Sequence, residues 1–203
     1  MSVTYPLSLP TVRNPVSMTL RQRKVVGVNV APGSLVPQVY EWPGERWELD
    51  MTFNVMERDV GGAWAGFLSA LRGSVGSFLA GDPTGTGPIG TAGGTPTVNG
   101  TTLAGARVLP VSGGTGTLKA GSLFSLGSGA TRQLYQVQTD ASLSSGLLDI
   151  WPALRLQAAN ATPIQLTNPT GRFMLKPGTM PEWTIDQKGY YHIANVSAWE
   201  DRR

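Results

Sequence analysis

The chain of 203 residues contains no cysteine. Disulfide bonds, thiolate metal sites and catalysis by a cysteine nucleophile are therefore excluded. This absence is compatible with assembly in a reducing cytoplasm. Histidine is almost absent too, because His192 is the only one. A single histidine without cysteine does not form a typical zinc site, so we expect His192 to be a structural or surface residue.

Charged side chains are scarce, at 14% of the residues, where an ordinary soluble domain has about 25%. Glycine (26 residues) and proline (15 residues) are abundant instead. This composition favours an all-β chain with many turns, and it indicates a surface that largely meets other protein. A stable secreted β domain is the alternative explanation of the low charge.

Acidic residues are missing from the first 40 positions, which carry four cations. The cations are Arg13, Arg21, Arg23 and Lys24. A basic segment can bind nucleic acid, but no aromatic residues are interleaved with these four charges. We therefore expect a solvated strand face or one side of a subunit contact, and no specific nucleic-acid binding.

Long hydrophobic runs are missing as well. No segment approaches the roughly 18 apolar residues that a membrane-spanning helix requires. The first ten residues hold two prolines and lack an apolar run of signal length. We expect a soluble protein without a membrane anchor.

Motifs for catalysis are not found in the sequence. There is no G-x-S-x-G nucleophile elbow. Glu45, Glu48 and Asp50 are close in sequence, but the last two would be solvated on one exposed strand face, unlike a working acid–base pair. Residues 85–90 match G-x-G-x-x-G without a strand–helix context, which is typical of a linker. We predict no catalytic residue, cofactor or metal site, and we do not expect an enzyme.

Alternating apolar residues predict the first strands. One strand is predicted over residues 15–30, followed by a turn at residues 31–34. A hairpin is predicted next, with a type II turn at Pro43-Gly44 between strands at residues 39–42 and 46–54. The strict alternation of the last strand is typical of a half-buried antiparallel strand.

One amphipathic helix is predicted after the hairpin, with Asp59 as its N-cap and Gly73 as its C-terminal cap. Trp64 and Phe67 belong to its apolar stripe. We expect both to pack as core residues on the apolar face of the preceding strand. That face is formed by Trp47, Leu49 and Met51.

The composition changes at residues 84–100, which are nearly all Gly, Thr, Pro and small apolar residues and are typical of a flexible connection. Short β runs follow, typical of a small barrel or sandwich. Strands of the first style then return, ending with a predicted strand at residues 190–199. The predicted fold class is all-β: a β-sandwich body with one α-helix, formed by residues 1–83 and 165–203, plus an inserted small β-barrel or sandwich domain at residues 84–164.

Six sequence blocks occur in an informative order. They are residues 5–10, 40–44, 67–83 with the pattern F-L-x-x-L-x-G-x-x-G-x-F-L-x-G-D-P, 118–127, 151–155 and 167–173. Together these blocks resemble the distal tail protein family of long-tailed, siphovirus-type bacteriophages. The resemblance extends over most of the chain, and it consists of turns and apolar positions, not of a catalytic motif.

The resemblance implies a virion protein of the tail tip, assembled in the host cytoplasm. Such proteins form a ring with copies of themselves, usually a hexamer, and contact the tail tube protein, the tail hub protein, the tape-measure protein and receptor-binding or fibre proteins. The alternative function is a carbohydrate-binding β module that contacts host-surface glycans. Its candidate platforms are Trp151 and Trp199, because the other four tryptophans have core or turn explanations.

A ring needs two different complementary surfaces on each subunit, and opposite charges would align them. We predict that the basic N-terminal segment of one subunit meets the acidic hairpin of its neighbour. The predicted interface residues are Arg13, Arg21, Arg23, Lys24, Glu41, Glu45 and Glu48.

Overall fold

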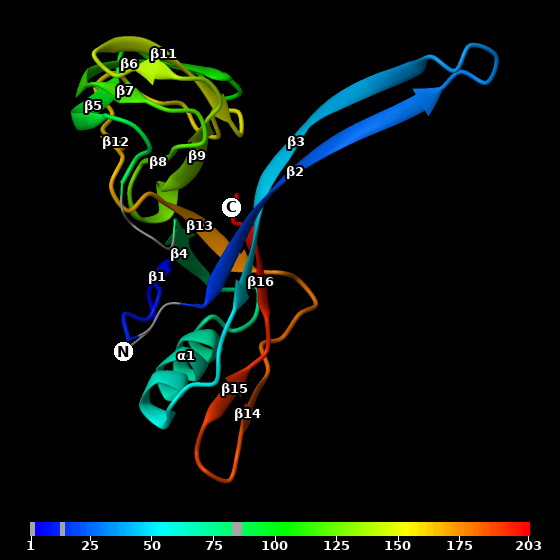
Figure 1. Cartoon of the computed structure of the whole chain (residues 1–203), viewed down its shortest axis with the longest axis vertical. Coiled ribbons are helices and arrows are strands. Elements are labelled where there is room, and N and C mark those ends of the chain that lie inside the picture. The colour runs from blue at the N-terminus through cyan, green and yellow to red at the C-terminus, as the bar shows by residue number, and fades with distance from the viewer. Residues whose placement is uncertain (1–2, 13–14, 83–86) are drawn as a thin grey trace.

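The computed structural model describes residues 3–12, 15–82 and 87–203. Within these ranges strands predominate, and α1 (Arg58–Ala70) is the single α-helix. The predicted all-β class with one helix is therefore confirmed. Figure 1 shows two strand assemblies, one around the helix and one above it, and a long two-stranded ribbon that extends beyond both.

The first sheet has six strands in the order β1-β4-β13-β16-β3-β2. Its strands are β1 (Leu7–Ser8), β2 (Ser17–Val30), β3 (Pro37–Thr52), β4 (Ser77–Gly81), β13 (Thr170–Leu175) and β16 (Val196–Glu200). Neighbouring strands are antiparallel, except that β1 runs parallel to β4. Segments from the two ends of the sequence therefore share one sheet.

The second sheet also has six strands, in the order β12-β8-β9-β11-β6-β5. Its strands are β5 (Gly93–Val98), β6 (Val108–Thr115), β8 (Leu123–Leu126), β9 (Gln133–Val137), β11 (Ser145–Trp151) and β12 (Ile164–Gln165). The Val98 backbone bonds to Thr162 and to Ala161, each at 2.9 Å, which joins the two edges of the sheet. The sheet is therefore nearly a closed barrel. A short pair, β7 (Thr117–Leu118) with β10 (Ala141–Ser142), and the 3-10 turn η1 (Gly129–Thr131) lie within the same segment.

The predicted flexible connection is only partly correct. Residues 93–98 form β5, and Val98 is buried in the barrel core. The strand consists of small residues without a clear apolar alternation, so the sequence pattern does not predict it. Pairing with β6 and burial of alternate residues stabilise it instead. The predicted boundary between residues 83 and 84 lies outside the described residues. At the other boundary Gln165 pairs within the barrel, so the next strand of the first sheet begins at Thr170.

The helix packs where its apolar stripe predicted. Trp64 is fully buried and Phe67 nearly so, in one hydrophobic cluster with Trp47, Leu49 and Met51. The helix begins after Glu57, so Asp59 lies in its first turn and is not the N-cap. The helix ends at Ala70 with Leu71 as its C-cap, so Gly73 is not the cap; Arg72 and Gly73 follow with positive φ angles of 50° and 66°.

A small hairpin also packs against the helix. Strands β14 (Trp183–Ile185) and β15 (Tyr191–Ile193) pair with each other, and β15 contacts α1. Gly61 permits this contact, because a Cβ atom there would lie 2.3 Å from Tyr191. The single strand predicted at residues 190–199 is wrong, since the chain leaves β15 at Ile193 and enters the first sheet at Val196.

The hairpin predicted around Pro43-Gly44 is wrong as well. Strand β3 runs without interruption from Pro37 to Thr52, and the chain reverses at residues 31–36. The register shifts at Pro43-Gly44: Lys24 pairs with Glu45, but Val26 pairs with Glu41. Proline lacks an N–H donor, so an irregular point in the ladder accepts it. The Pro43-Gly44 pair, which is typical of a turn, therefore lies at an irregularity within a continuous strand.

Candidate functional site

The far half of the β2–β3 ribbon is the most unusual surface of the molecule. We call residues 25–42 the arm; in Figure 1 it extends away from both sheets. No charged residue occurs from Val25 to Tyr40. Large apolar side chains of the arm are exposed nonetheless: Val25, Val26, Val28, Val30, Leu35, Val36, Val39, Tyr40 and Trp42.

The two faces of the arm differ. Val28 lies opposite Val39 in the ladder, and the same face continues to Val26 and Val30, which makes a valine stripe. On the other face the Trp42 ring lies over Gly27, where a Cβ atom would come within 2.7 Å of it. The valine stripe therefore faces solvent, and the other face is partly covered by the arm itself.

The turn at the tip of the arm presents a leucine. Leu35 has a positive φ of 55° and is 76% exposed. A non-glycine residue in the left-handed region is uncommon and costs free energy unless its surroundings compensate. Within the chain the described contacts of this turn are backbone bonds between Ala31 and Val36 and between Leu35 and Ala31, and a 3.5 Å bond from the Val36 N–H to the Ser34 hydroxyl. The turn thus holds an apolar side chain outward.

Most of the sequence-predicted interface charges pair within the same chain, some of them with partners outside the predicted set. Arg21 pairs with Asp50 at 2.8 Å across the two strands. Arg46 pairs with Glu48 at 2.9 Å on one strand. Lys24 pairs with Glu41. These pairs neutralise most of the predicted interface charges inside one subunit. Fewer unpaired charges therefore remain for the predicted contact between subunits.

Of the three remaining predicted residues, Glu45 also pairs within the chain, with Lys24 at 3.5 Å. Arg13 lies outside the described residues. Arg23 is exposed and opposes Arg46 in the ladder. Glu45 is 2% exposed and faces the barrel, so its partners come from this chain.

Glu45 lies at the junction between the first sheet and the barrel. One carboxylate oxygen accepts a 2.7 Å bond from Arg107, and the other accepts a 2.9 Å bond from the Ala153 N–H. Burial by itself raises the pKa of Glu45, but the Ala153 N–H and the Arg107 guanidinium outweigh it, and the pKa lies below its usual value. Glu45 is therefore an ionised contact between the two sheets.

A buried ion pair lies beside Glu45. Arg155 binds Glu200 with two bonds, at 3.1 Å from Nε and 2.8 Å from Nη2. Its Nη2 also donates to the Glu45 carbonyl at 2.7 Å, and the Trp47 N–H donates to Glu200 at 3.0 Å. Both charged side chains are almost completely buried. The pair thus joins the loop after β11 to β3 and β16.

Aromatic packing completes the junction. The Trp47 ring lies edge-on to Trp151, with centroids 4.5 Å apart, and its Nε1 donates to the Leu134 carbonyl at 3.0 Å. Trp151 is 4% exposed, so it is a core residue and not a surface platform for sugar. Trp199 is half-buried, with Arg46 stacked on its ring at 3.7 Å. The barrel is held against the first sheet by packing and by ion pairs together.

Sequence reasoning missed the partners of Glu45 and Glu200. Arg107 lies just before β6 and Arg155 lies in the loop after β11, far from both acids in sequence. Arg155 belongs to the block at residues 151–155 that resembles the tail-tip family, which was the available signal. No periodicity connects Arg155 to the Glu200 carboxylate, 45 positions away, or Arg107 to the Glu45 carboxylate, 62 positions away.

Chemistry-bearing groups are few. Among the residues that the structure describes, no group of three or more His, Cys, Asp or Glu is arranged to hold a metal ion. His192 is exposed, and its Nε2 lies 3.6 Å from Asp186, which accepts the backbone bonds of the β14–β15 turn. This arrangement is typical of a surface histidine near a turn.

Within the described ranges, no helix combines the length and hydropathy that crossing a membrane requires. Comparison of the chain with protein-family models finds no match. Comparison with curated proteins finds no match either. The candidate site that the molecule presents is therefore characterised by its geometry alone: an arm without charged residues from Val25 to Tyr40, beside an ion-paired junction.

Proposed function

We propose that the chain is a structural protein of a phage tail tip. It would form a closed ring with copies of itself, with six subunits as in the family that it resembles. The ring joins the tail tube to the hub and the receptor-binding apparatus. Sequence blocks along most of the chain support this proposal, and so does the all-β fold with one helix.

The arm is the observation that carries the proposal. A two-stranded ribbon is marginally stable by itself in water. Exposed contiguous apolar surface on a protein commonly marks a binding site, and buried centres of interfaces are depleted of charge. The valine stripe and Leu35 meet both descriptions. In a ring subunit, a surface of this kind can be one of the two complementary surfaces that contact the neighbours.

The junction supports a second part of the proposal. Two buried carboxylates, Glu45 and Glu200, bind cations of the barrel segment. Contacts of this kind hold the barrel in one orientation on the first sheet. In a ring, each copy would therefore present its barrel at the same place.

The alternative, a carbohydrate-binding barrel, is less well supported. Sugar-binding surfaces use exposed aromatic rings. Residues 84–164 contain three aromatic side chains, Phe124, Tyr135 and Trp151. All three are buried. The structural role is therefore the function that the geometry supports best.

The test is the oligomeric state of a variant with a shortened arm. Residues 27–40 are replaced by Asn-Gly, which joins Val26 to Glu41, its partner in the ladder. Light scattering after size exclusion and electron microscopy are compared with the unaltered chain. We expect a closed ring for the unaltered chain and a folded monomer for the variant.

A matched control removes exposed apolar side chains elsewhere. Leu103 and Leu147 lie on the barrel segment and are 67% and 62% exposed. Their replacement by serine should leave the ring intact. An unaltered chain that stays monomeric at all concentrations, or a ring that forms without the arm, would contradict the proposal.

A further inference from the structure

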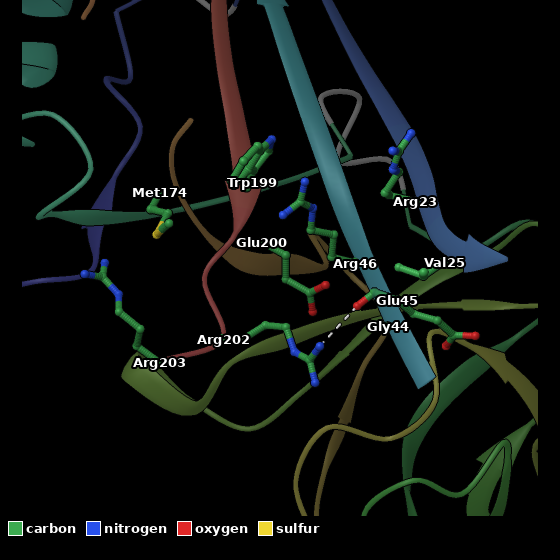
Figure 2. A pocket seen from close by; sticks show the side chains of 10 residues that line it. All are labelled: Arg23, Val25, Gly44, Glu45, Arg46, Met174, Trp199, Glu200, Arg202 and Arg203. Carbon is green, nitrogen blue, oxygen red and sulfur yellow. Dashed lines mark hydrogen bonds between the residues drawn. The ribbon is translucent and has the colours of Figure 1, made fainter. Parts of the chain in front are cut away.

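A groove of about 640 Å³ opens beside the base of the arm. Figure 2 shows side chains from β2, β3, β13 and β16 around it, together with the C-terminal residues. Arg46, Met174 and Trp199 alternate with core residues on their strands, so the groove lies on the sheet face opposite α1.

The floor of the groove is apolar. Met174 and Trp199 are paired neighbours on β13 and β16. Val25, at the base of the arm, is 50% exposed and adds a third apolar side chain. An aliphatic side chain of a partner could therefore be buried on this floor.

The walls of the groove are basic. Four arginines line it: Arg23, Arg46, Arg202 and Arg203. Two of them already have carboxylate partners, since Arg46 pairs with Glu48 and Arg203 with Asp201. Within the described residues, no carboxylate lies at ion-pair distance from Arg23 or Arg202.

Arg202 has only a weak contact in its place. Its Nη1 lies 3.4 Å from the Glu45 carbonyl oxygen (Figure 2). The carboxylates in the groove wall, Glu45 and Glu200, are buried and bound by Arg107 and Arg155. Two exposed guanidinium groups thus remain available beside an apolar floor.

We propose that this groove binds an extended acidic segment of a partner protein. Carboxylates of the segment pair with Arg23 and Arg202, and an apolar side chain between them packs on Met174 and Val25. The planar guanidinium group binds a carboxylate through two parallel hydrogen bonds. This geometry favours a carboxylate over an anion that can accept only one such bond. The inference goes beyond the proposed ring, because it concerns a surface away from the valine stripe.

The geometry favours a protein segment over nucleic acid. Single-stranded nucleic acid binds through bases that stack on exposed aromatic rings. Among the described residues that line the groove, Trp199 has the only aromatic ring, and the Arg46 guanidinium covers it at 3.7 Å. A nucleobase therefore has no free aromatic ring on which to stack in this groove.

The test uses the full chain and three fluorescein-labelled probes. They are the peptide Glu-Leu-Glu-Ser-Glu-Leu-Glu-Ser, the same peptide with Gln for each Glu, and an eight-nucleotide oligothymidylate. Fluorescence anisotropy is measured for the unaltered chain and for the double variant Arg23→Gln, Arg202→Gln. The control is Arg58→Gln, Lys188→Gln, which removes the same charge from exposed positions beside the α1 N-terminus.

We expect the acidic peptide to bind the unaltered chain and the control with equal affinity. The groove variant should lose about tenfold or more in affinity, and added salt should weaken binding. The proposal is overturned if the acidic peptide does not bind, if the Gln peptide binds as well, or if both variants lose affinity equally. Tighter, groove-dependent binding of the oligothymidylate would overturn it in favour of nucleic acid. A monomeric chain that passes this test would leave the groove inference standing while the ring fails.

Discussion

The β2–β3 ribbon contains two regions that share one hydrogen-bonded ladder but differ in their surroundings. At the base, Leu20 lies opposite Leu49, and Leu49 is completely buried under the helix. In the arm, Val28 lies opposite Val39, and these side chains are 62% and 63% exposed. The backbone pairing is alike, so packing alone distinguishes the two regions.

This contrast indicates what each region does. The base is stabilised by its own chain, through a core on one face and ion pairs on the other. The arm carries many large apolar side chains, as a core does, but the rest of the described chain leaves them exposed. Because burial contributes roughly 25 cal/mol for each Å² of apolar surface, the arm stabilises the chain mainly when a partner covers it.

The largest expected effect is at the base. Replacing Trp64 by alanine removes the largest fully buried side chain and leaves a cavity between α1 and the first sheet. We expect a loss of about 3–5 kcal/mol in the free energy of unfolding, measured by denaturant titration. A loss under about 1 kcal/mol would place the helix at the surface.

Removing a buried ion pair from the junction should lower the free energy of unfolding slightly less than the Trp64 substitution does. Arg155→Ala leaves Glu200 buried without its cation, and we expect a loss of about 3 kcal/mol in the free energy of unfolding. The matched control is Lys119→Ala, which breaks an exposed ion pair with Asp140 and should cost under about 1 kcal/mol. Equal losses for the two variants would show that the junction does not depend on the buried pair.

Acid should destabilise the fold in a defined direction. Burial by itself raises the pKa of Asp201, but bonds from Arg203 and Arg172 outweigh it, so the pKa is lowered, as for Glu45. Groups with lowered pKa contribute stability above their unfolded pKa, about 4, and lose it as the pH falls toward the folded pKa. The free energy of unfolding should therefore decrease below about pH 4, and Glu45→Gln should reduce this decrease.

A smaller effect is expected at Tyr135, inside the barrel. Its hydroxyl accepts a 3.0 Å bond from the Arg155 N–H, and burial raises its pKa to about 12. Tyr135→Phe removes that acceptor without changing the ring, and should cost about 1 kcal/mol in unfolding free energy. No change at all would mean that the loop after β11 finds another acceptor.

The smallest effect on the isolated chain is expected in the arm. Val28→Ala should change the monomer's unfolding free energy by no more than about 0.5 kcal/mol, as exposed substitutions do. Leu49→Ala, its counterpart at the base, should cost about 2–5 kcal/mol. If the two substitutions had equal effects on a monomer, the contrast between arm and base would be wrong.

Several elements were predictable because their information is local. The period-two pattern identified β2 and the buried face of β3, and helical spacing identified α1 with Trp64 and Phe67 in the core. Short apolar runs identified most of the barrel strands. Each of these patterns reflects one buried face, which a segment carries in its own sequence.

Other features depended on distant partners. Pro43-Gly44 has the chemistry of a turn, yet pairing with β2 on both sides kept it within a strand. Trp151 could not be assigned until Trp47 was found beside it. The same holds for Glu45, whose neighbours Arg107 and Ala153 come from the barrel segment.

The sequence by itself determined the all-β class, the helix and its core residues, the scarcity of charge and the lack of cysteine chemistry. Tertiary structure alone decided that residues 25–42 project as an exposed arm and that the predicted interface charges pair within one chain. It also decided that ion pairs of two buried carboxylates, Glu45 and Glu200, join the barrel to the first sheet. The physical reason is that side-chain periodicity records which face is apolar, whereas exposure and ion pairing depend on which distant segment covers that face.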